Sequence, residues 1–420
     1  DAHVHLRDFE QSHKETIVSG TKGALRGGTT TVLTMPNTKP PLTTSNIIEK
    51  YKKGAIQSSP ESYRNTLFCN VGLFCSIKND FSPEDLDDRE MKRIFGIKIY
   101  PKDRGETLKL EWESSWQSDF GASEFSWDLT QKMENPNSKS LLIESHSNWF
   151  RLFSIAKKQN LPLLFHPEVI TSSEKLTKQQ LQMEFELQKR GNRNPNLILH
   201  NFHHPIERNE RALVEMIVTL LRVGVPDPSE APHVHFCHIS SPECLIIIES
   251  ELRKKGYPCS VEVTPHHVLL NHQTKFERES YGKVLVPLRA PKIQEQLYEF
   301  VKKGKLIDII ATDHAPHTVE EKTKGGFVEA PSGLPYVDFA PRLMLNEVLM
   351  ERVPLNVLIE TYCTGPARIF GLQKKGKIAE GYDADLILVE KVANYKIQGK
   401  DALSKQKWLP FQDREICAKI

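Results

Sequence analysis

Short apolar runs that end abruptly in polar residues alternate along the chain with longer stretches of helical character. The runs include "TTTVLTMPN", "LPLLFHPE" and "LIDIIATDHAPH", and buried parallel strands have this continuous apolar composition. Between them lie stretches such as "NERALVEMIVTLLRVG" and "KIQEQLYEFVKKG", whose apolar spacing is typical of helices. About seven or eight strand–helix units over roughly 350 residues predict an α/β fold, a (β/α)8 barrel of the TIM type. A doubly wound open sheet fits the alternation almost as well.

The polar residues at the ends of the runs favour the barrel. In a barrel the carboxyl ends of all strands meet at one mouth, so side chains from distant parts of the sequence come together there. In this chain a histidine, lysine or aspartate ends run after run. The candidates for the mouth are His3, His5, Lys98, His166, His238 and Asp313.

Most of these candidates are histidines, and histidine and aspartate are ligands suited to zinc or a similar divalent ion. In "DAHVHLRDF", the residues His3, His5 and Arg7 occupy every second position, so in a strand they face the same side. Two neutral imidazoles that face one way form half of a metal site. A polar strand face with ordinary hydrogen-bonded histidines is the alternative, and this stretch alone leaves it open.

Lys98 in "GIKIYP" does not fit a metal site as an ammonium, because like charges at about 4 Å repel by several kcal/mol in a partly buried site. A neutral lysine reacts with carbon dioxide to give an N-carboxylate, whose two oxygens can bridge two metal ions. This hypothesis gives the lysine a role among the ligands. A structural lysine that extends outward from the end of a strand is the alternative.

Composition excludes several classes of function. A formal net charge of +2 over 420 residues argues against a surface for nucleic acid. No run approaches the roughly 18 apolar residues of a membrane span. Seven scattered cysteines without a CxxC pair predict reduced thiols and a cytoplasmic protein.

The order of motifs predicts two parts. Residues 1–365 are expected to form the metal-dependent barrel, with 102–140, polar and rich in turn-forming residues, as an elaborated loop. Residues 366–420 have strand-like runs separated by glycines, as in "GKIAEGYDADLILVEKVANYKIQG", and are expected to return the chain to a small β domain.

Nine blocks spread over the chain resemble the signature blocks of the dihydroorotase family, a cyclic amidohydrolase branch of the amidohydrolase superfamily. Their order along the chain is also the order in that family. The blocks are "DAHVHLRDF", "TMPNTKPPLT", "GIKIYP", "LLFHPE", "FCHIS", "VTPHH", "VPLRAP", "ATDHAPHT" and "APSGLPYVDF". The resemblance covers nearly the whole chain, except 102–140 and part of 170–230.

The resemblance implies a site with two zinc ions. One ion is expected on His3, His5 and Asp313, the second on His166 and His238, with N-carboxylated Lys98 bridging the two. The implied substrate contacts are Arg7, Asn37 and His317 for a carboxylate, and the backbone near Val286 and Ala330 for the pyrimidine ring. An arginine presents a planar fork that matches a carboxylate, which agrees with the implied role of Arg7.

The implied activity is the reversible hydrolysis of L-dihydroorotate to N-carbamoyl-L-aspartate, whose reverse is the third step of de novo pyrimidine biosynthesis. A hydroxide bridging the metal ions attacks the ring amide, and Asp313 acts first as general base and then as general acid. Dihydropyrimidinase, hydantoinase and allantoinase share the metal ligands, but their substrates have no carboxylate for Arg7 and Asn37. A catalytically silent scaffold that associates with aspartate transcarbamoylase is a further alternative. A homo-oligomer is also left open.

The chain departs from the family in three places. Pro167 follows His166 where relatives more often have a small residue, and "VPLRAP" replaces a more usual asparagine-proline-proline sequence, so Val286 is expected to contribute only its backbone. Relatives also continue with β-domain strands beyond both ends of this chain. The small β domain is therefore expected to be truncated or reduced.

Overall fold

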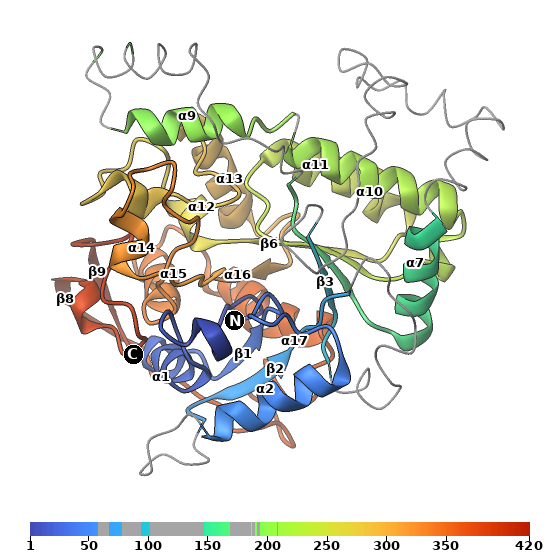
Figure 1. The fold of residues 1–420 in the computed structure, drawn as a ribbon, viewed down its shortest axis with the longest axis horizontal. Helices are drawn as coiled ribbons and strands as arrows, with labels where there is room; N and C mark the ends of the chain where they lie inside the picture. Colours follow the sequence, from blue (N-terminus) through green and yellow to red (C-terminus); the bar gives the residue numbers. More distant parts are fainter. Residues whose placement is uncertain are drawn as a thin grey trace.

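A closed ring of parallel strands forms the centre of the computed structural model (Figure 1). The model describes residues 1–57, 67–77, 94–100, 147–168, 186, 190, 194–207 and 209–420. The predicted elaborated loop at 102–140 lies outside these residues. The ring strands are β1 (Thr31–Thr34), β2 (Asn70–Leu73), β3 (Ile97–Ile99), β4 (Leu163–Phe165), β5 (Val234–Phe236), β6 (Cys259–Val263) and β7 (Ile309–Ile310).

Isolated bridges complete the ring where the regular strands stop. β1 pairs with β2, and strands β3 to β7 pair in sequence order, all in parallel. Cys75 bridges to Ile97 and joins β2 to β3. Val4 bridges to Thr34 on one side and to His314 on the other, so the segment around Val4 is the eighth member and closes the barrel among the described residues. The predicted (β/α)8 barrel is confirmed, and the open sheet is not formed.

Helices surround the ring and bury its outer face (Figure 1). Those predicted from "NERALVEMIVTLLRVG" and "KIQEQLYEFVKKG" are present as α10 and α13. The described helices are α1 (Ile17–Gly27), α2 (Ser45–Gln57), α7 (Ser147–Gln159), α9 (Pro195–His203), α10 (Glu210–Gly224), α11 (Pro242–Glu251), α12 (Pro265–Leu269), α13 (Pro291–Lys303), α14 (Val319–Thr323), α15 (Ala340–Leu349), α16 (Leu355–Ile359) and α17 (Gly365–Ile369).

Local sequence explains where α1 begins and ends. Thr16 accepts a hydrogen bond from the backbone of Ser19, and the Ser19 side chain accepts one from the backbone of Thr16, which is a capping box. The helix ends at Gly28, whose φ of 95° is a left-handed conformation that glycine adopts without strain. This helix follows directly on the segment of His3 and His5, so its capping fixes the path of the chain out of the ring.

Apolar side chains fill the amino-terminal end of the barrel interior. Phe370, which follows α17, packs edge-on against Phe74 and His235, with ring centroids 5.2 and 5.4 Å away. Leu33 on β1 and Leu164 on β4 belong to the same buried cluster. This end is closed by packing, and the polar residues are left to the other end.

The last part of the chain adds a two-stranded antiparallel sheet of β8 (Glu390–Lys396) and β9 (Glu415–Lys419), with β9 against α15. Trp408, between these strands, packs inward on Tyr281 with ring centroids 4.4 Å apart. The preceding segment is open to solvent, with Ile378 and Leu388 each 90% exposed. The predicted division between 1–365 and 366–420 stays a prediction. No helix among the described residues is long and apolar enough to span a membrane.

Candidate metal centre and active site

A cavity of about 720 Å³ opens at the carboxyl end of the barrel strands. Almost all of the predicted site residues line this cavity, although they come from opposite ends of the barrel sequence, with Arg7 and His317 for example 310 residues apart. They are His3, His5, Arg7, Asn37, Lys98, His166, His238, Asp313, His317 and Ala330. Val286 is the exception: its neighbours Val284 and Leu285 line the cavity instead, and the Val286 carbonyl accepts a hydrogen bond from His267 Nε2 at 2.9 Å.

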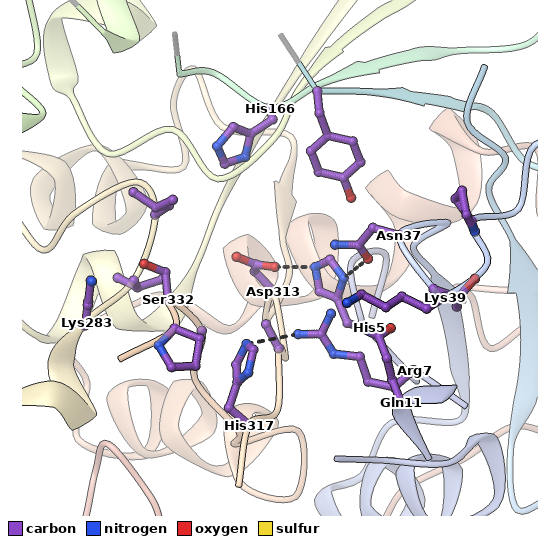
Figure 2. Close-up of a pocket in the computed structure, with 18 of the residues that line it drawn as sticks. His5, Arg7, Gln11, Asn37, Lys39, His166, Lys283, Asp313, His317 and Ser332 are labelled. Atoms are coloured by element: carbon purple, nitrogen blue, oxygen red, sulfur yellow. Dashed lines mark hydrogen bonds and ion pairs between the residues drawn. The ribbon is translucent and has the colours of Figure 1, made fainter. Parts of the chain in front are cut away.

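Two imidazoles converge on one carboxylate oxygen in the first half of the site, and Figure 2 shows the one of His5 beside Asp313. His5 Nε2 lies 2.9 Å and His3 Nε2 lies 3.3 Å from Asp313 Oδ1. The bridge between Val4 and His314 places these segments side by side. Burial raises the pKa of a carboxyl group, but the imidazoles outweigh it and hold the pKa of Asp313 well below its usual range. The Asp313 carboxylate is therefore ionised beside two nitrogen donors.

The opposite nitrogen of each imidazole also has a partner. Glu262 Oε1 lies 2.8 Å from His3 Nδ1, and Asn37 Oδ1 lies 2.6 Å from His5 Nδ1. Burial lowers the pKa of an imidazole, but Glu262 outweighs this for His3 and raises its pKa to about 10. His5 has only a neutral amide behind it, and burial lowers its pKa to about 4.

The second half of the site is formed by His166 and His238, which follow β4 and β5. His166 Nδ1 and His238 Nε2 are 3.1 Å apart. Behind His166, the buried Glu168 Oε2 lies 3.6 Å from Nε2, and Glu168 is itself hydrogen-bonded to His204. His238 and His3 connect the two halves, with ring centroids 5.3 Å apart.

Lys98 lies between the halves, in the middle of β3, with none of its surface exposed. Its Nζ donates a hydrogen bond to Cys237 Sγ at 2.8 Å. Burial raises the pKa of a thiol, but the Lys98 charge lowers that of Cys237 to about 6. A buried ammonium that donates its hydrogen bond to a sulfur atom is an unusual arrangement for a purely structural lysine.

The donor set fits metal ions. One donor atom each of His3, His238 and Asp313 lies within 4.8 Å of the others, and all three residues are buried. Neutral imidazole nitrogens and an ionised carboxylate are the ligands that zinc and similar divalent ions prefer. His3, Cys237 and Glu262 form a second such group, which shares His3 with the first.

A wall of cationic and polar groups stands beside these ligands. Arg7 Nη2 lies 3.4 Å from His317 Nε2, and Lys14 Nζ lies 3.2 Å from His317 Nδ1. Burial, together with the charges of Arg7 and Lys14, lowers the pKa of His317 to about 3, so its ring is neutral at pH 7. Asn37 faces the same part of the cavity (Figure 2). The arrangement suits an anion that carries hydrogen-bond acceptors.

Sequence analysis missed two lysines that hold the opposite wall. Lys322 Nζ is buried and donates to the backbone carbonyls of Pro331, Lys283 and Gly333 at 2.8, 3.1 and 3.2 Å. Lys283 Nζ donates to the carbonyls of Val328 and Phe327 at 2.8 and 3.1 Å. Together they hold 327–333, which includes the predicted contact Ala330, against the cavity. Lys322 was missed because it lies in the charged sequence "EEKTK", and such a sequence is typical of a solvent-exposed helix.

Comparison with known proteins decides the family. Residues 151–408 match the model of the amidohydrolase family. The chain belongs to the amidohydrolase family. Curated relatives named dihydroorotase include one from Methanosphaera stadtmanae, 28% identical over 99% of this chain and 80% of the relative. Another, from Thermoplasma acidophilum, is 30% identical over 98% of this chain and 78% of the relative. This amidohydrolase is a hydrolase of cyclic amide bonds.

Solved structures agree on the amidohydrolase fold. The L-hydantoinase (dihydropyrimidinase) of Arthrobacter aurescens superimposes with a TM-score of 0.75, 20% identity and coverage of 100% of this chain and 81% of that one. A D-hydantoinase (dihydropyrimidinase) from Thermus sp. has a TM-score of 0.70, also at 20% identity, with the same coverage of both chains. At this identity the likeness concerns the fold alone.

Proposed function

We propose that this amidohydrolase is a dihydroorotase, which interconverts L-dihydroorotate and N-carbamoyl-L-aspartate. The observation that carries the proposal is the wall of Arg7, Asn37 and His317 in the same cavity as the imidazole and carboxylate ligands. A cyclic amide with a carboxylate beside the ring fits both sets of residues: its carboxylate fits the arginine side, and its amide fits the metal ligands. Dihydrouracil, hydantoin and allantoin have no carboxylate for the arginine to bind.

Two zinc ions fit the donor set in this proposal. His3, His5 and Asp313 would hold one ion, and His166 and His238 the other. When bound, such ions polarise the amide carbonyl and lower the pKa of water between them. These ligands come from segments that are separated in the sequence but meet at the mouth of the barrel.

N-carboxylation of Lys98 resolves the charge conflict at the centre of this site. An ammonium buried among ligands for two dications is strongly repelled, whereas a carbamate carries a negative charge and two oxygens for bridging. The full burial of Lys98 and its place on β3 between the halves support this modification. Loss of the positive charge also removes the ion pair with Cys237.

Arg7, Asn37 and His317 would bind the carboxylate of the substrate and thereby set the ring against the metal ligands. The guanidinium group offers parallel donors that fit two carboxylate oxygens. His317 is neutral and donates from one ring nitrogen only. The backbone of Ala330, on the wall that Lys322 holds, faces the ring from the other side. A backbone contact from Val286 stays a prediction.

Asp313 would move the proton. Its carboxylate takes a proton from the attacking water, and the same oxygen then gives it to the ring nitrogen as the bond from carbonyl carbon to nitrogen breaks. The low pKa that the neighbouring imidazoles impose keeps Asp313 ionised before the reaction. In the ring-closing direction the steps reverse and water is released.

The test measures ring opening of L-dihydroorotate by the purified protein, with metal content determined on the same sample. We expect turnover with about two zinc ions per chain and none with dihydrouracil, hydantoin or allantoin. Turnover of hydantoin or dihydrouracil with an inert dihydroorotate would reassign the enzyme to the hydantoinase class. Two bound metal ions without any turnover would make the chain a silent scaffold.

A further inference from the structure

The two imidazoles of the first half differ in what lies behind them. His3 is backed by Glu262, which is completely buried and does not line the cavity. His5 is backed by Asn37, which does line the cavity and is only half-buried. A metal-binding histidine commonly donates its second ring nitrogen to such a partner, which fixes the orientation of the ring. At His5 this partner is at the same time part of the wall that faces the substrate.

The oxygen of Asn37 fixes the form of His5. A carbonyl oxygen only accepts hydrogen bonds, so at 2.6 Å it requires the proton of the imidazole on Nδ1. The Nε2 of His5 is then the nitrogen that faces Asp313, at 2.9 Å from Oδ1, where the ligand atoms of the first half meet, and it is the nitrogen that would bind a metal ion there. Rotating the ring or moving its proton breaks this arrangement.

The nitrogen of the same amide remains for another partner. Figure 2 shows the Asn37 side chain with its oxygen toward His5 and its nitrogen directed into the cavity. The turn that carries Asn37 is held by a hydrogen bond of 2.9 Å from Leu42 N to Pro36 O. The amide therefore has a fixed position with one end on a metal ligand and the other toward the space for substrate.

We propose that Asn37 is a positioning residue that couples the two functions of the site. Its oxygen orients His5 for the metal ion, and its nitrogen donates to the carboxylate of the substrate. The second half of this statement rests on the proposed function. Because coupling between two ligands is reciprocal, substrate bound at Asn37 favours metal at His5, and metal at His5 favours substrate.

Two substitutions separate the ends of the amide. Asn37→Asp keeps an acceptor for His5 Nδ1 but removes the donor and adds a charge that repels a carboxylate. Asn37→Ala removes both ends. Asn70→Ala is the matched control, because Asn70 is an exposed asparagine on β2 whose amide bonds the Thr30 carbonyl and Asp385. Circular dichroism and urea unfolding check that all variants fold.

The first readout is zinc affinity, measured without substrate by competition with a chromophoric chelator. We expect Asn37→Ala to weaken one of two zinc equivalents by about 10- to 100-fold. Asn37→Asp and Asn70→Ala should keep both equivalents within a few fold of wild type. Wild-type zinc affinity in Asn37→Ala, or equal losses in the alanine and aspartate variants, would overturn the orienting role.

The second readout is calorimetric binding of N-carbamoyl-L-aspartate to the zinc-loaded protein. Both Asn37 variants should bind it at least tenfold more weakly, although only the alanine variant has lost zinc affinity. Unchanged binding by Asn37→Asp would overturn the donor role. If the wild type neither opens dihydroorotate nor binds this ligand, both the proposed function and the role of Asn37 as a donor to substrate are wrong. The zinc measurement still decides whether Asn37 orients His5.

Discussion

His3 and His5 have a hydrogen-bonded partner behind each ring, whereas the rings of the second half are held less directly. Glu262 and Asn37 lie 2.8 and 2.6 Å from the outer nitrogens of the first pair. In the second pair, His238 Nδ1 is buried without a hydrogen-bond partner in the described part of the chain, and Glu168 lies 3.6 Å from His166 Nε2. Each ring of the first half therefore has a hydrogen-bonded partner on its outer nitrogen, whereas the outer nitrogen of His238 in the second half has none among the described residues.

The largest effect is expected at Asp313, where the first half meets the reaction. Asp313→Asn keeps the shape of the side chain but removes the proton acceptor, so kcat for dihydroorotate should fall by about 10²- to 10⁴-fold. Steady-state kinetics with metal content measured in parallel tests this. A kcat within tenfold of wild type at full metal loading would show that another group moves the proton.

Glu262 and Glu168 offer a matched test of the two halves, because each is a completely buried carboxylate beside a histidine. Glu262→Gln should destabilise the metal-free protein by about 3–5 kcal/mol, since it removes the nearer of the two carboxylates beside the buried His3. It should also weaken one zinc equivalent by about 10- to 100-fold.

Glu168→Gln should also destabilise the protein, through its bond with His204, but should change zinc affinity by only a few fold. Urea unfolding and chelator competition on both variants give the comparison. Equal losses of zinc affinity in the two variants would show that both carboxylates support their histidines equally. That result would contradict the expectation from the distances, which are 2.8 Å from Glu262 to His3 and 3.6 Å from Glu168 to His166.

Arg7→Lys tests the wall beside the first half. A lysine keeps the charge but loses the planar pair of donors, so KM for dihydroorotate should rise about tenfold with a smaller change in kcat. Zinc affinity should change little, because lysine keeps the positive charge at this position and the hydrogen bond described for Arg7 is made with His317. An unchanged KM would show that Arg7 does not bind the carboxylate of the substrate.

The support behind the second half should be sensitive to acid. The His200 ring packs edge-on against His204, which is hydrogen-bonded to Glu168, and burial lowers the pKa of His200 to about 3. In the unfolded chain His200 takes up a proton near pH 6.5, whereas the folded protein excludes that proton until about pH 3. Stability should therefore fall by about 1.4 kcal/mol per pH unit between pH 6 and 4 from this residue alone.

Urea midpoints of wild type and His200→Gln measured across this range isolate the contribution of His200. The difference between the two proteins should shrink as the pH falls. Parallel curves for the two proteins would show that His200 is not kept neutral by the fold.

The sequence predicts that these residues meet at one cavity, because the order of strands determines where their carboxyl ends lie. Once "LLFHPE" and "FCHIS" are assigned to neighbouring parallel strands, His166 and His238 must meet at the mouth. Glu262 was not predicted, although a single charge inside the buried strand "CSVEV" is a signal that a partner is present. Its target, His3, is 259 residues away, so local sequence does not name it.

The hydrogen bonds that hold the cavity lining around 327–333 were also less predictable, because their partners are not specified by the local sequence. Lys322 lies in a charge run, and only the path of 327–333 shows that its ammonium group faces inward to three carbonyls. The position of Val286 follows from the bond between its carbonyl and His267, which the sequence does not specify. The prediction for 102–140 lies outside the described residues.

The bridge between Val4 and His314 sets the order of events when the chain folds. The two residues are separated by most of the barrel, so their pairing carries a large loop-closure cost and waits until the intervening strands are in place. His3, His5 and Asp313 flank this bridge, and they have no common binding point in a partly synthesised chain. In the proposed two-zinc site, the first ion would consequently bind only to a closed ring, and its free energy of binding would be added to the stability of the completed barrel and of no intermediate before it.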